Sequence, residues 1–189
     1  MATPLHTQAT LQINRAPVLT LWGAVVAERL GFTWEEALTL GRAVAGLNAY
    51  AKGRSLGLFT PTAPEVKAQR QTQREKEPLL VDLLQRAVPV RATPAGLRAL
   101  SKEQPIDPAS VQRYLHSKFG PALDDAYKAM HHLAASRSPD VLAAEAYALY
   151  ERFRPAIPAG TRGWGASGPL HLAAIHQLAT AARPEDSGC

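Results

Sequence analysis

The chain has 189 residues, 46% of them hydrophobic, which suits one domain, alone or with a small appendage. Polar residues interrupt its longest apolar stretch, which excludes a membrane-spanning segment of about 18 residues, and its only cysteine, Cys189, excludes an intrachain disulfide. The charge is uneven: residues 42–118 hold 13 Lys/Arg and 6 Asp/Glu, a net of +7, whereas the segments on either side are each −1. This segregation favours an anionic partner, although a solvated basic face explains it equally well.

Residues 14–182 are expected to form a single compact domain between two tails. Residues 1–13 form the first tail, with a short extended piece at 10–13, and residues 183–189 form the second. The N-terminus lacks the basic and apolar parts of a signal peptide, so a cytoplasmic location is the default.

Residues 14–58 are predicted to hold two apolar helices joined by a tight corner. Pro17 suits the first turn of the first helix, and Gly31 is expected to end that helix in the left-handed conformation. Thr33 and Glu36 have capping-box spacing and start the second helix. Small residues then recur at every fourth position, at Ala37, Gly41, Ala45 and Ala49.

Gly41 and Gly46 are expected to mark a close approach between helices. Interior glycine costs a helix about 1 kcal/mol relative to alanine, so its use there needs a packing reason. The helix pair is therefore predicted to be the core of the domain.

Residues 23–42 resemble a helix-turn-helix motif. The resemblance implies that the second helix enters a DNA groove. The sequence departs from this at Trp34, Glu35 and Glu36, because carboxylates at the start of that helix repel phosphate. A plain helical hairpin explains the same corner. The matching positions are Val26, Ala27, Leu30, Gly31, Phe32, Thr33, Ala37 and Leu40.

The middle of the chain is predicted to be a basic arm or linker at residues 60–78 and a β-hairpin at 79–102. Residues 79–84 are strand or helix by their apolar run, Pro89 and its neighbouring valines favour strand, and residues 93–96 suit a turn. Arg91, Arg98 and Lys102 are expected to edge the hairpin. A helix pair followed by a hairpin is the outline of a winged helix, apart from the long segment between them.

Residues 105–182 are predicted to be helical. Asp107 is expected to cap one helix and Gly120 to close it, and a final helix is expected at about 169–182. The glycine-rich loop at 157–168 is either an anion site assisted by Arg162 or a turn whose Trp164 fills the core. The whole chain also resembles a bacterial protein family of uncharacterised function, through residues 15–57, 105–120 and 157–168, and this resemblance implies no activity.

Catalytic and metal-binding signatures are not found. Ser167 does not fit a nucleophile elbow, because Pro169 stands where that motif needs glycine. His131 and His132 are adjacent and so point to different sides of a helix. Asp124 is expected to pair with Lys128, and His171 and His176 are expected to be unpaired. We predict no catalytic residue, no metal ligand and no cofactor, and an enzyme is the least favoured reading.

The predicted fold is mainly α with a small β-hairpin and an N-terminal pair like a helix-turn-helix. The predicted function is a non-catalytic nucleic-acid-binding or DNA-associated regulatory protein that mainly contacts the backbone. The alternative is a helical protein–protein interaction module, including a homodimer that uses the apolar helix pair or the terminal helices. The predicted nucleic-acid contacts are Arg42, Lys52, Arg54, Arg70, Arg74, Arg91 and Arg98.

Overall fold

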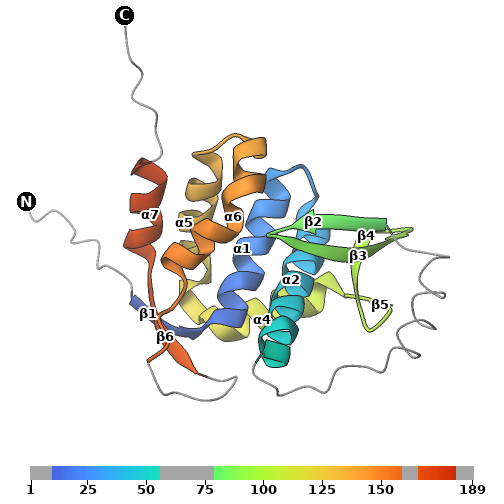
Figure 1. Ribbon diagram of the computed structural model, residues 1–189, viewed down its shortest axis with the longest axis horizontal. Coiled ribbons are helices and arrows are strands. Elements are labelled where there is room, and N and C mark those ends of the chain that lie inside the picture. Colours follow the sequence, from blue (N-terminus) through green and yellow to red (C-terminus); the bar gives the residue numbers. More distant parts are fainter. Residues whose placement is uncertain (1–9, 56–78, 159–165, 182–189) are drawn as a thin grey trace, which may run out of the picture.

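The computed structural model describes residues 10–55, 79–158 and 166–181. In these ranges the protein is mainly helical with two small antiparallel sheets, which confirms the coarse fold class (Figure 1). The helices are α1 (Arg15–Arg29), α2 (Trp34–Ser55), α4 (Pro108–Phe119), a 3₁₀ turn η1 (Gly120–Ala122), α5 (Leu123–Ala135), α6 (Pro139–Phe153) and α7 (Leu172–Ala181). The strands are β1 (Thr10–Asn14), β2 (Leu79–Leu83), β3 (Arg86–Thr93), β4 (Gly96–Ser101), β5 (Gln104–Pro105) and β6 (Ser167–His171).

Helix α1 lies at the centre of the molecule. Figure 1 shows α5 and α6 on one side of it and α2 with the larger sheet on the other. Every residue of α1 from Pro17 to Ala27 is buried, and the helix contacts α2, α4, α5 and α6. The predicted core is therefore confirmed, and its apolar surface is covered by the same chain.

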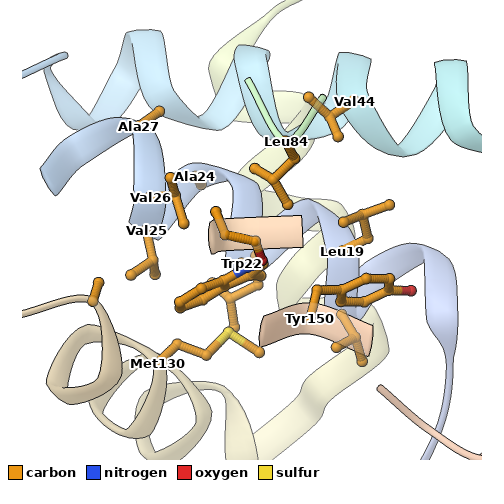
Figure 2. Packing of buried hydrophobic residues seen from close by; sticks show 14 of the residues in the cluster. Leu19, Trp22, Ala24, Val25, Val26, Ala27, Val44, Leu84, Met130 and Tyr150 are labelled. Atoms are coloured by element: carbon orange, nitrogen blue, oxygen red, sulfur yellow. Dashed lines mark hydrogen bonds between the residues drawn. The ribbon is translucent and has the colours of Figure 1, made fainter. Parts of the chain in front are cut away.

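Trp22 is the largest side chain in this core and is fully buried. Its Nε1 donates a hydrogen bond of 2.8 Å to the carbonyl oxygen of Ala146 in α6, and its ring meets that of Phe153 edge-on at 5.3 Å between centroids. Figure 2 shows it in one cluster with Met130 of α5 and Tyr150 of α6. Burial of the Tyr150 hydroxyl raises its pKa to about 12.

The corner between α1 and α2 has the predicted capping chemistry. Gly31 has a φ of +114°, a value that glycine adopts without strain. The Glu36 amide donates to Thr33 Oγ1 at 3.3 Å, and the Thr33 amide donates to Glu36 Oε1 at 3.0 Å. These two bonds form the reciprocal capping box, so this local prediction is confirmed.

The close approach of α1 and α2 is confirmed at Gly41 and wrong at Gly46. A Cβ placed on Gly41 would lie 2.7 Å from the Ala24 amide nitrogen and would also clash with the carbonyl oxygen of Thr20. A Cβ on Gly46 meets no atom within 4 Å, because Gly46 faces away from α1 and is exposed. Gly23 of α1 lies opposite Gly41 and contributes to the same contact.

The larger sheet has the strand order β2-β3-β4-β5, with every neighbouring pair antiparallel. The predicted hairpin is present as β3 and β4, joined by the turn at residues 93–96, and residues 79–83 are strand rather than helix. The prediction missed the two flanking turns. Leu84 and Gln85 both have positive φ, as do Lys102 and Glu103. Such turns favour Asn-Gly, so the sequence carries little signal for these pairs.

A second sheet of two strands joins the two ends of the described chain. Strand β1 pairs antiparallel with β6, with Ile13 opposite Gly168. Two boundaries were therefore predicted wrongly: residues 10–13 belong to the fold rather than to a tail, and the last helix starts at Leu172, because Pro169 lies in β6. Gly168 is needed there, because a Cβ would clash with the carbonyl oxygen of Ala156.

Helix α4 begins and ends as predicted. Asp107 Oδ1 accepts a hydrogen bond of 3.1 Å from the Ala109 amide at the start of α4, and Gly120, with φ of +56°, ends that helix. The predicted roles of Arg162 and Trp164 lie outside the described residues.

Candidate nucleic-acid interface

Two cations lie against one tyrosine ring where α2 packs on α4. The guanidinium carbon of Arg42, on α2, is 4.5 Å from the centroid of the Tyr114 ring on α4. The ammonium nitrogen of Lys118 is 6.0 Å from the same centroid. Both cationic residues are exposed, whereas Tyr114 is half-buried. We call Arg42, Tyr114 and Lys118 the α2–α4 basic cluster.

The cluster follows from helical spacing and from the cap of α4. Asp107 and Pro108 set the start of α4, so Tyr114 and Lys118, one turn apart, share a face. Packing of α4 on α2 then brings Arg42 to that face. Burial raises the pKa of Tyr114, and the positive charge of Arg42 opposes this rise, so the ring carries no charge at neutral pH.

Arg86 lies on the part of the sheet that packs beside α2. Its Nη2 donates a hydrogen bond of 3.1 Å to Oδ1 of Asn48, which follows Arg42 on α2. Sequence analysis did not select Arg86, Tyr114 or Lys118. The one available signal was the four-residue spacing of Tyr114 and Lys118 on the helix predicted after Asp107.

Arg98 was predicted to contact phosphate, but in the structure the residue is buried. Its residue exposure is only 7%. Its guanidinium donates to the carbonyl oxygens of Leu97 and Ala95 and pairs with Glu35 Oε2 at 3.3 Å. The side chain thus ties the β3–β4 turn to the start of α2. Both terminal nitrogens of its guanidinium thus have partners within the protein.

The other predicted contacts lie in different parts of the chain. Arg91 is half-buried and stands opposite Arg98 in the β3–β4 register, so the two side chains share a face of the sheet. Lys52 and Arg54 belong to the end of α2, where only the backbone is described. Arg70 and Arg74 lie outside the described residues. Of the predicted set, Arg42 alone is placed on the α2–α4 basic cluster.

The first turn of α2 is bound to the edge of β4. The Leu97 amide donates a hydrogen bond of 2.8 Å to Glu36 Oε2, and the Ala99 amide donates one of 3.0 Å to Thr39 Oγ1. Two side chains of α2 thereby satisfy backbone donors that β4 would otherwise expose at its edge. The helix start that a helix-turn-helix uses to read DNA is therefore occupied by the protein's own sheet.

Glu36 is expected to make the stability pH-dependent. Hydrogen bonds from the backbone amides of Thr33 and Leu97 lower the pKa of the Glu36 carboxyl. A carboxyl group with a lowered pKa in the folded state stabilises the fold at pH values above its pKa in the unfolded chain. This contribution is lost as the pH falls through the folded-state pKa. We expect Glu36→Gln to be less stable at neutral pH and to lose less stability on acidification, measured by urea unfolding at a series of pH values. Glu103→Gln, at an exposed turn residue, should follow the wild type; parallel curves for wild type and Glu36→Gln would contradict the prediction.

A cleft of about 600 Å³ opens between the start of α2, the β3–β4 hairpin and the segment from β5 into the start of α4. Its polar groups are bonded to one another: Trp34 Nε1 donates 3.3 Å to Gln112 Oε1, and Arg98 pairs with Glu35. Asp107 caps α4 at its rim. The carboxylates of Glu35 and Asp107 lie at the opening, and their negative charges oppose the binding of phosphate.

The prediction about acidic and histidine residues is partly correct. Asp124 pairs with Lys128 at 2.7 Å, as expected. His176 was expected to be unpaired, but packing of α7 on α5 places its Nδ1 3.2 Å from His132 Nδ1. His171 lies 3.2 Å from Thr10 Oγ1 across β1 and β6. In the described part of the chain, no group of three or more His, Cys, Asp or Glu could hold a metal ion.

Comparisons with protein-family models, curated proteins and solved structures found no match to this chain. The resemblance to a bacterial family therefore stays a prediction. Among the described helices, none combines the length and apolar character needed to cross a membrane.

Proposed function

We propose that this protein binds nucleic acid without catalysis and contacts mainly the phosphate backbone. The observation that carries the proposal is the α2–α4 basic cluster, in which the exposed residues Arg42 and Lys118 both lie near the Tyr114 ring. Among the described ion pairs, none involves Arg42 or Lys118. Their charges are therefore available to an anionic ligand.

The charge distribution supports the same surface. The cluster lies in residues 42–118, the segment with a net charge of +7. Arginine binds phosphate through paired N–H donors, and lysine acts as a point charge. Phosphate contacts carry no sequence information directly, so we expect similar affinity for duplexes of different sequence.

The proposal differs from groove reading by a winged helix. In a winged helix the first turn of α2 would face DNA. Glu35 and Glu36 occupy that turn, and Glu36 is bonded to β4. We therefore assign the contact to the part of α2 around Arg42 and to the facing side of α4.

A salt titration tests the assignment. Each neutralised phosphate contributes about 0.9 to the slope of log affinity against log salt for duplex DNA. We expect the double variant Arg42→Gln/Lys118→Gln to lower this slope by about two. Fluorescence anisotropy with labelled duplex and single-stranded DNA provides the measurement.

The matched control is Lys128→Gln/Arg152→Gln. It removes two exposed positive charges from α5 and α6, which lie on the other side of α1 from α2 (Figure 1). The control should keep the wild-type slope. The assignment would be overturned if the wild-type affinity did not depend on salt concentration. It would also be overturned if the two double variants gave equal slopes of log affinity against log salt.

A second candidate function is protein–protein interaction, and strand β2 favours it. Leu79 and Leu80 are 66% and 62% exposed, and in the described sheet β2 pairs on one side only, with β3. An exposed strand edge with apolar side chains can accept a strand from a partner. The homodimer version that used the helix pair is disfavoured, because α1 is covered by the chain itself.

Sedimentation velocity across a dilution series tests self-association. If β2 joins two copies, wild type should show a dimer, and Leu80→Lys should be monomeric because a charge opposes edge pairing. A monomer at every concentration would exclude the homodimer and leave only a different partner.

A further inference from the structure

We infer that His132 and His176 form a two-imidazole site for a divalent transition-metal ion, which ties α7 to α5. The two residues come from helices that are far apart in sequence and packed together in the fold. Their rings are 5.4 Å apart between centroids and inclined at 44°. Both side chains are exposed, so water can reach the pair and complete the coordination of an ion.

The spacing of the two nitrogens suits a metal. His132 Nδ1 and His176 Nδ1 are 3.2 Å apart. Two zinc–nitrogen bonds of about 2.0–2.1 Å at a tetrahedral angle place their nitrogens about 3.3–3.4 Å apart. The fold therefore already holds the two ligands at nearly the separation that a bound ion requires, and a small ring rotation would direct both lone pairs at it.

The metal-free pair is consistent with this role. At 3.2 Å one Nδ1 donates a proton to the other, so the contact requires at least one ring to be neutral. A neutral imidazole is the form that binds metal, and Zn²⁺, Ni²⁺ and Cu²⁺ are the ions that prefer it.

A metal ion at this site would strengthen the packing of α7 on α5. In the described structure α7 packs mainly on α5, and the preceding strand β6 pairs with β1. An ion that binds only when the two helices are packed stabilises that packed state by mass action. Metal binding is thus expected to hold β6 and α7 against the body of the protein.

The chain supplies its own controls. His131 is adjacent to His132, but its ring lies against Tyr127, 5.7 Å between centroids. His171 lies near His176 in sequence, but it contacts Thr10 of β1. Neither ring is at the proposed site, so substituting either one tests for nonspecific histidine–metal binding.

The experiment is a titration of the full chain with Zn²⁺ by isothermal calorimetry, with Ni²⁺ as a second ion. We expect one ion per chain, at least about tenfold weaker binding in His132→Gln and in His176→Gln, and unchanged binding in His131→Gln and His171→Gln. Thermal unfolding should show a zinc-dependent rise in Tm that EDTA reverses and that both site variants lose.

Circular dichroism of each variant without metal separates loss of the site from loss of the fold. A variant with the wild-type spectrum and undiminished zinc binding would overturn the inference. So would equal weakening in all four variants, or wild-type protein that binds no zinc. If His132→Gln fails to fold, the zinc and nickel titrations of His176→Gln are compared with those of the wild type and the two control variants.

Discussion

Replacing Gly41 by alanine is expected to lower the free energy of unfolding by about 3 kcal/mol, at the upper end of overpacking effects. A Cβ at this position would lie 2.7 Å from the Ala24 amide nitrogen and would also clash with the carbonyl oxygen of Thr20. Both atoms belong to the backbone of α1, the central helix. A rotamer change cannot relieve the contact, so α1 and α2 must move apart.

Gly46→Ala is the matched control on the same helix. A Cβ there meets no atom within 4 Å. We expect this variant to be more stable than wild type by about 1 kcal/mol, because alanine favours helix over glycine. Urea unfolding of the two variants should therefore shift in opposite directions. Equal shifts, or a Gly41→Ala variant as stable as wild type, would remove the claim of close helix packing.

Truncating Trp22 to alanine is expected to cost about 3–5 kcal/mol. The ring is fully buried, and its removal leaves a cavity against Phe153 in the middle of the core. The hydrogen bond to the carbonyl oxygen of Ala146 is lost as well. The loss should appear as a lower midpoint of urea unfolding. The slope of the free energy of unfolding against urea concentration should not change, because unfolding exposes a similar surface area.

Trp34→Ala is the comparison for the same chemical change at the surface of the fold. Trp34 is half-buried at the cleft, where its ring meets Tyr127 edge-on at 5.3 Å and its Nε1 donates to Gln112. Partial burial predicts a smaller loss of about 1–2 kcal/mol. A Trp34→Ala variant as unstable as Trp22→Ala would contradict the assignment of the core to α1.

The proposed contact surface depends on this core. Packing of α1 against α2 and α4 fixes where those two helices face each other, and the α2–α4 basic cluster lies at that junction. A destabilised core variant should therefore lose nucleic-acid binding together with the fold. Arg42→Gln/Lys118→Gln, at exposed positions, should weaken the proposed binding with the fold intact.

The residue types alone could not identify which arginine side chains are exposed enough to contact an anionic ligand. Arg42, Arg91 and Arg98 lie in the same basic segment and were predicted alike. In the fold Arg98 pairs with Glu35 and two carbonyl oxygens, whereas Arg42 lies exposed over the Tyr114 ring. The strand register and the packing of the sheet on α2 decide this difference, and both depend on contacts across about 60 residues of chain.

The sequence by itself determined the features that depend on neighbouring residues. The capping box of Thr33 and Glu36, the left-handed Gly31 and the cap at Asp107 were all predictable, because each involves atoms within a few residues. The burial of α1 was predictable as well, because a run with so few polar side chains is stable only inside a core.

The tertiary structure alone decided which distant residues meet. The pairing of β1 with β6 and the contact of His132 with His176 join parts of the chain separated by many residues. Periodicity assigns a residue to a face of its own helix or strand, but it does not indicate which element covers that face. The partner of each face follows from the packing of the whole core, and for this reason the basic cluster and the histidine pair emerged only from the fold.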